Sequence, residues 1–401
     1  MPRTLVEFPG VTSGGAEPAR QPDGLLHYGD LTPCLTELLD LRVHRYAQRD
    51  AVVEVGAAGR PTQRISYREL WTSASRVAGG LGNRGIGYGD RVGIALPNGI
   101  RWAQAFLGAL LSGAVPVPIN CAAGPAEVAH MLADSAIDFL LDGELPIGPA
   151  FIDDGASLGE VALLCYTRGL GAKPKGVELS NENLLSAIES VIAAERLPTD
   201  GVKNLVLLPL AHATGCVDQF LPTLAVGGTV FVGSGIEAGD VRAIVEDEEI
   251  DVLTAGPATY GLLAAGRVLS GLVHDGMRRI CCAGGALTDQ VSAALRSAFP
   301  AAAQWSWWGA TETSGVALTM PEDAASTHPG CVGAAFGATE VALWGPEADA
   351  GVGELLCRGP NVMRGYWRDP VATAAQFTGQ WFHTGDQVRI DSDGFVRLLA
   401  Q

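Results

Sequence analysis

Glycines and lysines in the stretch LLCYTRGLGAKPKGVELS are typical of a loop that binds phosphate. Gly169 and its neighbouring glycines would let backbone N–H groups approach an anion, and Lys173 and Lys175 would add positive charge. The spacing differs from a P-loop, because no Gly-Lys-Ser or Gly-Lys-Thr follows at the required distance. Taken alone, the stretch therefore favours a surface turn between two subdomains.

Apolar strands alternate with helices on both sides of this loop. The alternation runs through residues 65–142 and returns through 204–285, which predicts parallel sheets flanked by helices. From about residue 329, short strands separated by Gly and Pro turns indicate a smaller β-rich module. We predict an α/β fold with a loose leader at 1–30, doubly wound sheet subdomains at 31–185 and 186–328, and a β-rich, distorted-barrel subdomain at 329–401.

The composition limits the partners. A net charge of −17 and a pI near 4.8 disfavour binding to nucleic acid or to anionic lipid. The eight cysteines form no C-x-x-C pair, and several lie in apolar runs, which suits reduced thiols better than disulfides or a zinc site. We find no signal-like N-terminus and no transmembrane segment, and therefore expect a cytoplasmic protein.

Five motifs in a fixed order carry a family resemblance. The stretches WWGATETSG (307–315), GELLCRGPNVMRGYW (353–367) and WFHTGDQVRIDSDGFV (381–396) follow the loop and PLAHATG (209–215). Together they resemble the acyl- and aryl-adenylating superfamily of AMP-binding enzymes, from about residue 30 to the last residue. Members such as acyl-CoA synthetases and fatty acyl-AMP ligases join a carboxylate to ATP, release pyrophosphate and usually pass the acyl group to a thiol. The resemblance implies ATP or AMP and Mg²⁺ as cofactors.

The resemblance also implies the site residues. Glu312 would hold Mg²⁺, for which a carboxylate is a suitable hard ligand, and Thr311 and Lys175 would act with it in catalysis. Asp386 would bind the ribose hydroxyls, and Trp308 would stack on adenine where the family usually has Tyr. By itself, each of the two carboxylates would be an ordinary solvated side chain. The other implied nucleotide-binding residues are Thr167, Arg168, Gly169, Lys173, Gly284, Gly285, Ala286, Gly309 and Ala310.

The PLAHATG motif implies a substrate pocket at His212 and Gly215. A histidine after an apolar strand is equally typical of a core residue, so both interpretations of His212 stay open. Adenylation domains for amino acids carry an Asp near this place, whereas Asp218 comes too late in the register. Because the strand and helix around the motif are also apolar, we expect an aliphatic or aromatic carboxylic acid as the substrate rather than an amino acid.

The chain departs from the family pattern in two places. In the loop, Arg168, Leu170, Gly171 and Ala172 stand where the family has Ser, two Thr and Gly, so three hydroxyl donors to phosphate are lost. Arg168 would compensate in part as a charged donor. At the end, Ala400 and Gln401 stand at the family's Gly-Arg pair, and we expect the mobile C-terminal domain to be absent.

These departures leave two functions open. The first is ATP-dependent activation of a fatty or other hydrophobic acid, which the altered loop and the missing C-terminal domain would impair. Its acceptor would be CoA or a carrier-protein thiol, with a separate C-terminal domain as partner. The second is a non-catalytic protein of the same fold that binds an acyl group or a nucleotide.

Overall fold

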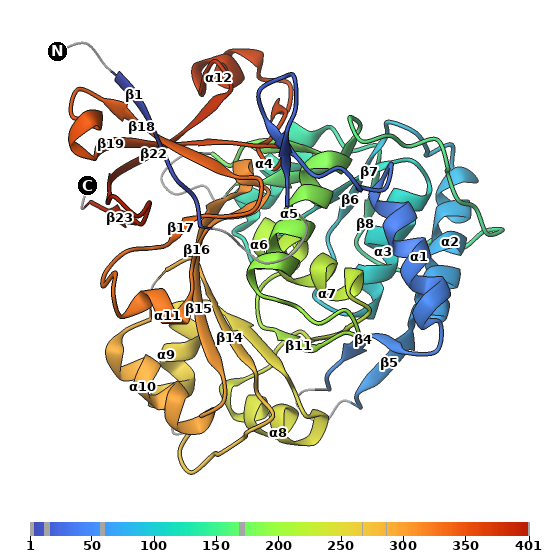
Figure 1. Ribbon diagram of the computed structural model, residues 1–401. Coiled ribbons are helices and arrows are strands. Elements are labelled where there is room, and N and C mark those ends of the chain that lie inside the picture. The colour runs from blue at the N-terminus through green and yellow to red at the C-terminus, as the bar shows by residue number, and fades with distance from the viewer. Residues whose placement is uncertain are drawn as a thin grey trace.

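A nine-stranded mixed sheet joins both parts of the predicted α/β region (Figure 1). The computed structural model describes residues 4–11, 17–56, 61–167, 173–266, 268–285 and 287–399. The inner strands pair in parallel, and β5, β16 and β17 are antiparallel to their neighbours. The order is β17 (Ala334–Ala335), β16 (Gly315–Met320), β15 (Ala303–Ala310), β14 (Arg279–Ala283), β13 (Val252–Ala255), β11 (Lys203–Val206), β12 (Thr229–Val232), β4 (Asp50–Glu54) and β5 (Gln63–Ser66).

Helices cover both faces of this sheet, as a doubly wound fold requires. Successive residues of a strand face opposite sides, so Val52 packs in one apolar cluster and Val53 in another. The Val53 cluster includes residues of α8 (Ala238–Glu248), α9 (Pro257–Ala265) and α10 (Asp289–Ala298). The Val52 cluster includes residues of α1 (Leu35–Tyr46), α2 (Tyr67–Gly82), α3 (Ile100–Leu111), α5 (Asn181–Ala194) and α7 (Leu221–Ala225).

A second group of strands carries the loop. The parallel strands β7 (Val115–Pro118), β6 (Arg91–Ile94) and β8 (Phe139–Leu141) form one small sheet, and α4 (Pro125–Ser135) connects the first of them to the last. The antiparallel strands β20 (Gly365–Tyr366), β10 (Gly176–Ser180) and β9 (Val161–Tyr166) form another. The loop with the glycines and lysines connects β9 to β10.

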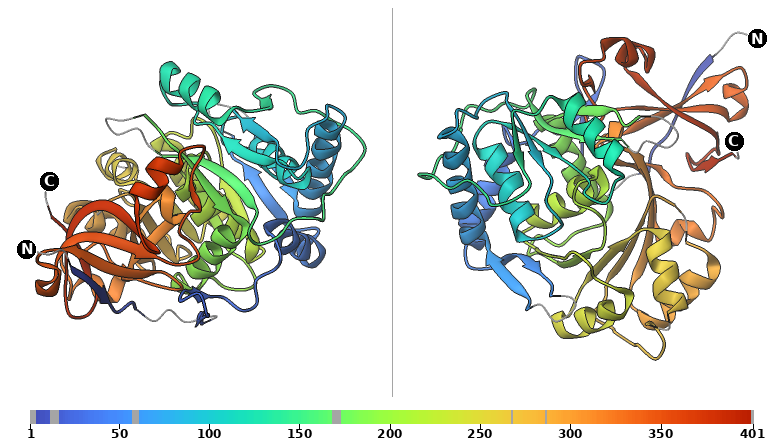
Figure 2. Two further views of the ribbon diagram at one scale, coloured as in Figure 1. Left: turned by 90° about the horizontal axis from the view of Figure 1, so that it is seen from above. Right: turned by 180° about the vertical axis from the view of Figure 1, so that it is seen from behind.

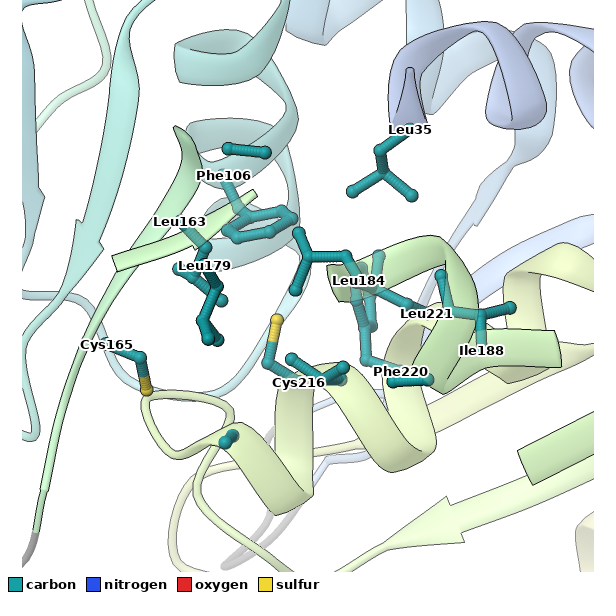
Figure 3. Packing of buried hydrophobic residues seen from close by; sticks show 14 of the residues in the cluster. Leu35, Phe106, Leu163, Cys165, Leu179, Leu184, Ile188, Cys216, Phe220 and Leu221 are labelled. Carbon is teal, nitrogen blue, oxygen red and sulfur yellow. The ribbon is translucent and has the colours of Figure 1, made fainter. Parts of the chain in front are cut away.

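Apolar packing fixes this hairpin to the helices behind it. Figure 3 shows Phe106 of α3 close to Leu163 of β9, Leu179 of β10 and Leu184 of α5. All four side chains are fully buried, and burying a side chain of this size contributes about 1.5–3 kcal/mol. The ends of the loop are therefore held by a rigid base.

The β-rich part contains the first strand of the chain. β1 (Thr4–Phe8) pairs antiparallel with β18 (Glu340–Gly345), so the expectation of a loose leader is wrong for these residues. The physical reason is that TLVEF has the alternation and β-branched content of a strand, and β18 offers an unpaired edge. The sheet continues through β19 (Val352–Arg358), β22 (Trp381–Ile390) and β21 (Phe377–Thr378), and β23 (Val396–Leu398) pairs with β22.

In Figure 2, the β-rich part lies to one side of the α/β sheets, with β1 and β23 both on that side. Because β4 and β5 join strands of the later region, the sheets cross the subdomain boundary we expected at residue 185.

No helix among the described residues is long and apolar enough to span a membrane. The short elements are β2 (Ala19–Arg20), β3 (Leu26–His27), α6 (Ala213–Gly215), the π-helix η1 (Cys216–Phe220), the 3₁₀ turns η2 (Thr311–Thr313) and η3 (Ala348–Ala350), α11 (Glu322–Ala325) and α12 (Pro370–Ala375).

Candidate active site

One cavity of about 470 Å³ gathers most of the site residues that the sequence indicated. Arg168, Gly169 and Ala286 lie outside the described residues, as do Leu170, Gly171 and Ala172. Thr214, Tyr366 and Thr384 also line the cavity, although the sequence analysis did not single them out. The expected residues that line it are Thr167, Lys173, Lys175, His212, Gly215, Gly284, Gly309, Ala310, Thr311 and Glu312.

The turn that carries Thr311 and Glu312 is fixed by its neighbours. It lies between β15 and β16, where a Cβ added to Gly309 would lie 2.0 Å from the carbonyl oxygen of Gly315. Only glycine allows this close approach. The Met363 N–H donates to the Glu312 carbonyl (2.8 Å), and Asn361 Nδ2 donates to the Thr313 carbonyl (3.1 Å). The backbone beneath Thr311 and Glu312 is thus held from the β-rich part.

Glu312 and Lys175 both contact Tyr366. The Tyr366 hydroxyl donates to Glu312 Oε1 (2.8 Å), and Lys175 Nζ lies 4.4 Å from the centroid of the Tyr366 ring. Mg²⁺ is commonly held by one or two carboxylates together with substrate phosphates. Among the described residues, no three His, Cys, Asp or Glu side chains gather as a metal cluster. The donor set therefore fits Mg²⁺ that arrives with a nucleotide triphosphate.

The two ends of the loop are tied together and to α4. The Thr167 N–H donates to the Lys175 carbonyl (3.0 Å), and the Lys175 N–H donates to Thr167 Oγ1 (3.0 Å). His130 Nε2 bonds the Pro174 carbonyl (2.9 Å), and the Tyr166 hydroxyl donates to Asp134 Oδ2 (2.8 Å). These contacts place Lys173 and Lys175 at the cavity wall.

His212 lines the cavity rather than the core. It precedes α6, and its Nε2 lies 3.2 Å from Asn120 Nδ2. Gly215 is required at the end of α6, because an added Cβ would lie 2.2 Å from the Pro209 carbonyl oxygen. Asp218 is buried in η1 and does not line the cavity; it accepts from the Val316 N–H (3.1 Å), and burial raises the pKa of its carboxyl group well above the ordinary value.

Asp386 and Trp308 lie together near this cavity. The Asp386 N–H donates to Thr384 Oγ1 (3.1 Å), and Gly385 between them has a φ of +81°. Partial burial raises the pKa of Asp386, while a hydrogen bond from the Trp308 side chain opposes the rise. Neither side chain lines the cavity itself, and nor does Gly285. The structure thus brings the two expected nucleoside-binding side chains next to each other.

A second cavity of about 580 Å³ shares Leu208 and Pro209 with the first. Asn120 and Thr259 line it, and most of its other lining is apolar. His212, which contacts Asn120, therefore stands where the two cavities meet. The apolar residues that line the second cavity include Leu96, Ile119, Leu207, Ile236, Val241, Leu262 and Leu263.

Comparison with known proteins identifies the family of the chain. The family model described as "AMP-binding enzyme" matches residues 39–148 and 151–367. A feruloyl-CoA synthase from Amycolatopsis is 31% identical over 361 residues, covering 84% of this chain and 73% of that protein. A sulfoacetate–CoA ligase from Cupriavidus necator is 29% identical over 383 residues, again covering 84% of this chain and 73% of that protein.

Solved structures show the same fold. A long-chain-fatty-acid CoA ligase from Rhodopseudomonas palustris, described as putative in its structure report, superposes with a TM-score of 0.81 at 24% identity, covering 92% of this chain and 99% of that one. O-succinylbenzoate CoA synthetase from Bacillus subtilis, in complex with AMP, superposes with a TM-score of 0.81 at 22% identity. The match covers 92% of this chain and 79% of that one. These likenesses show the fold, and the family match shows the membership that the five motifs indicated. The chain belongs to the family of AMP-binding enzymes, and its relatives are CoA ligases.

Proposed function

We propose that this protein activates a hydrophobic carboxylic acid with ATP. An oxygen of the carboxylate attacks the α-phosphorus, the bond to pyrophosphate breaks, and an acyl-adenylate forms. The observation that carries the proposal is the meeting of Lys175, His212, Thr311 and Glu312 in one cavity. These side chains come from separate parts of the chain, and a merely structural role would not require them at one surface.

Each side chain has a role that its chemistry supports. Negative charge builds on the phosphate oxygens during the attack, so the Lys175 ammonium and the Thr311 hydroxyl would stabilise it. Glu312 would hold Mg²⁺, which supplies further positive charge at the phosphates when it is bound. Asp386 would accept from the ribose hydroxyls, and Trp308 beside it would contact the adenine.

The acid would lie across the two cavities. Its carboxylate would bind in the first cavity beside His212, and its apolar part would extend past Leu208 and Pro209 into the second. Burial of the apolar part would contribute about 25 cal/mol per Å² of surface. The relatives support CoA as the thiol acceptor, and a carrier-protein thiol is the alternative.

The residues at 168–172 favour a second candidate, a protein that binds an acyl group or a nucleotide without catalysis. They replace three hydroxyl donors that would grip the leaving pyrophosphate. Weaker contacts there would reduce turnover more than they would reduce recognition of AMP, because AMP lacks those phosphates.

Pyrophosphate release with a panel of aliphatic and aromatic acids separates the two candidates. The wild-type chain should release pyrophosphate with at least one apolar acid, and Glu312→Gln should not. Binding of AMP is measured in parallel by calorimetry. Background release with every acid, together with AMP binding, would establish the non-catalytic alternative.

A further inference from the structure

Tyr366 lies between two of the proposed catalytic side chains. Its hydroxyl donates to Glu312 Oε1 (2.8 Å), and Lys175 Nζ lies 4.4 Å from the centroid of its ring. The residue is only 7% exposed. The hydrogen bond to Glu312 is partly shielded from water and is therefore stronger than at the surface, whereas Lys175 is exposed and its contact with the ring is the weaker of the two.

The backbone of Tyr366 is held from two sides. Its N–H donates to Thr373 Oγ1 (2.9 Å), and β20 pairs with β10 in the register Val177 to Tyr366. The next residue continues the pairing, because the Trp367 N–H donates to the Gly176 carbonyl (2.8 Å). As β10 begins directly after Lys175, this pairing sets the position of the ring relative to the ammonium group.

An aromatic ring suits this place because it competes with a direct ion pair between Lys175 and Glu312. A lysine and a glutamate that line the same cavity attract each other, and a direct ion pair would withdraw both from a phosphate ligand. The Tyr366 ring gives Lys175 a different partner, and the hydroxyl gives Glu312 one. Within the described residues, Glu312 Oε2 accepts no hydrogen bond, whereas Oε1 is occupied.

We propose that Tyr366 is a positioning residue that makes Glu312 a one-oxygen ligand for a divalent cation and keeps Lys175 apart from it. The hydroxyl fixes the carboxylate so that Oε2 is the oxygen left for the metal. The ring holds Lys175 where it can meet the phosphates. This inference rests on the proposed function, since it assumes that Glu312 binds the cation.

Tyr366→Phe tests the hydroxyl, because it keeps the ring and removes only the bond to Glu312. Mn²⁺ serves as the probe, and its binding to the full chain with ATP is followed by electron paramagnetic resonance. Loss of a hydrogen bond to a metal ligand typically weakens metal binding about 10- to 100-fold, which is the change we expect. The matched control is Tyr28→Phe: Tyr28 is 6% exposed, and its hydroxyl bonds Ser190 Oγ (2.9 Å) away from the cavity. Its Mn²⁺ affinity should equal that of the wild type.

The outcomes are distinct. Unchanged Mn²⁺ affinity in Tyr366→Phe overturns the positioning role and leaves the proposed function intact. A wild-type chain that binds no Mn²⁺ with ATP overturns the proposed function, and this inference with it. Should Tyr366→Phe show no cooperative unfolding, Thr373→Val replaces it, since it removes the bond to the Tyr366 N–H; weaker Mn²⁺ binding supports the role, and unchanged binding overturns it.

Discussion

Asn120 Nδ2 lies 3.2 Å from His212 Nε2, and the Asn120 Oδ1 accepts from the Ala122 N–H at 3.0 Å. The second bond orients the amide, so its nitrogen faces the imidazole. Because an amide nitrogen only donates, this pairing requires Nε2 to be the acceptor and leaves the proton of the neutral ring on Nδ1. The contact therefore sets the tautomer of the side chain that stands between the two cavities.

Asn120→Ala should weaken binding of the acid substrate. A hydrogen bond of this kind contributes about 0.5–1.5 kcal/mol, which corresponds to a 2- to 10-fold rise in KM for the acid. The KM for ATP should change less. The control is Asn83→Ala, which removes an exposed amide at the end of α2. An unchanged KM for the acid in Asn120→Ala would show that the orientation of His212 does not matter for the acid.

Asp386→Ala should weaken binding of AMP by about 1.5–3 kcal/mol, the range for hydrogen bonds to a charged group. Isothermal titration calorimetry measures the change. Asp393→Ala is the control, because that carboxylate lies on the turn after β22 and its side chain is 71% exposed. Equal affinity in the two variants would contradict the assignment of Asp386 to the ribose.

Thr259→Trp should change which acids are activated. The larger side chain would occupy part of the second cavity, which Thr259 lines. We expect KM to rise at least about tenfold for the longest acids of the panel, since each lost methylene contact is worth about 1–3 kcal/mol. The shortest acids should be unaffected, and Thr259→Ser should behave as the wild type. A uniform change across the panel would place the apolar part of the acid elsewhere.

Restoring the family residues in the loop should raise pyrophosphate release. The change is Arg168→Ser, Leu170→Thr, Gly171→Thr and Ala172→Gly. Each added donor to a charged oxygen contributes about 1.5–3 kcal/mol, so a tenfold increase is a conservative expectation. Background release in the restored protein, with an acyl-adenylate analogue still bound, would support the non-catalytic function.

Glu195 should make the stability of the fold depend on pH. It is buried at the end of α5, and burial raises the pKa of its carboxyl group from 4.5 to about 8, although Arg279 and a hydrogen bond with Cys281 lower it. Between these values the folded chain binds a proton that the unfolded chain releases. The free energy of unfolding therefore falls as pH rises, by up to about 1.4 kcal/mol per pH unit.

Glu195→Gln should remove this slope and stabilise the protein near pH 8. Asp218, whose pKa is also raised by burial, contributes a slope of the same sign between its unfolded and folded pKa values, so some dependence will remain there. Denaturant unfolding at several pH values measures the effect. Glu246→Gln is the control for loss of charge, because Glu246 lies on α8 and its side chain is 45% exposed. Parallel slopes in wild type and Glu195→Gln would contradict the prediction.

Local sequence predicted much of this molecule. The strands at β6, β7, β11, β12 and β13 are apolar runs bounded by turns, and the motifs brought Thr311, Glu312 and Lys175 into one expected site. The position of Tyr366 beside Glu312 and Lys175 cannot be predicted from its motif, because it arises from the pairing of β20 with β10. The membership of β4 and β5 in the large sheet likewise depends on contacts between distant segments. Periodicity indicates that a strand exists, and it carries no information about which strand will lie beside it.

The pairing of β1 with β18 has a consequence for handling the protein. β1 occupies the edge of its sheet, next to β18 and far from β22. Removing it by proteolysis would uncover the unpaired N–H and C=O groups of β18, and an exposed edge of this kind is a template for another chain. A preparation trimmed at its first residues would then tend to aggregate through β18 while its cavity remained intact, so loss of solubility and loss of activity would be separate events.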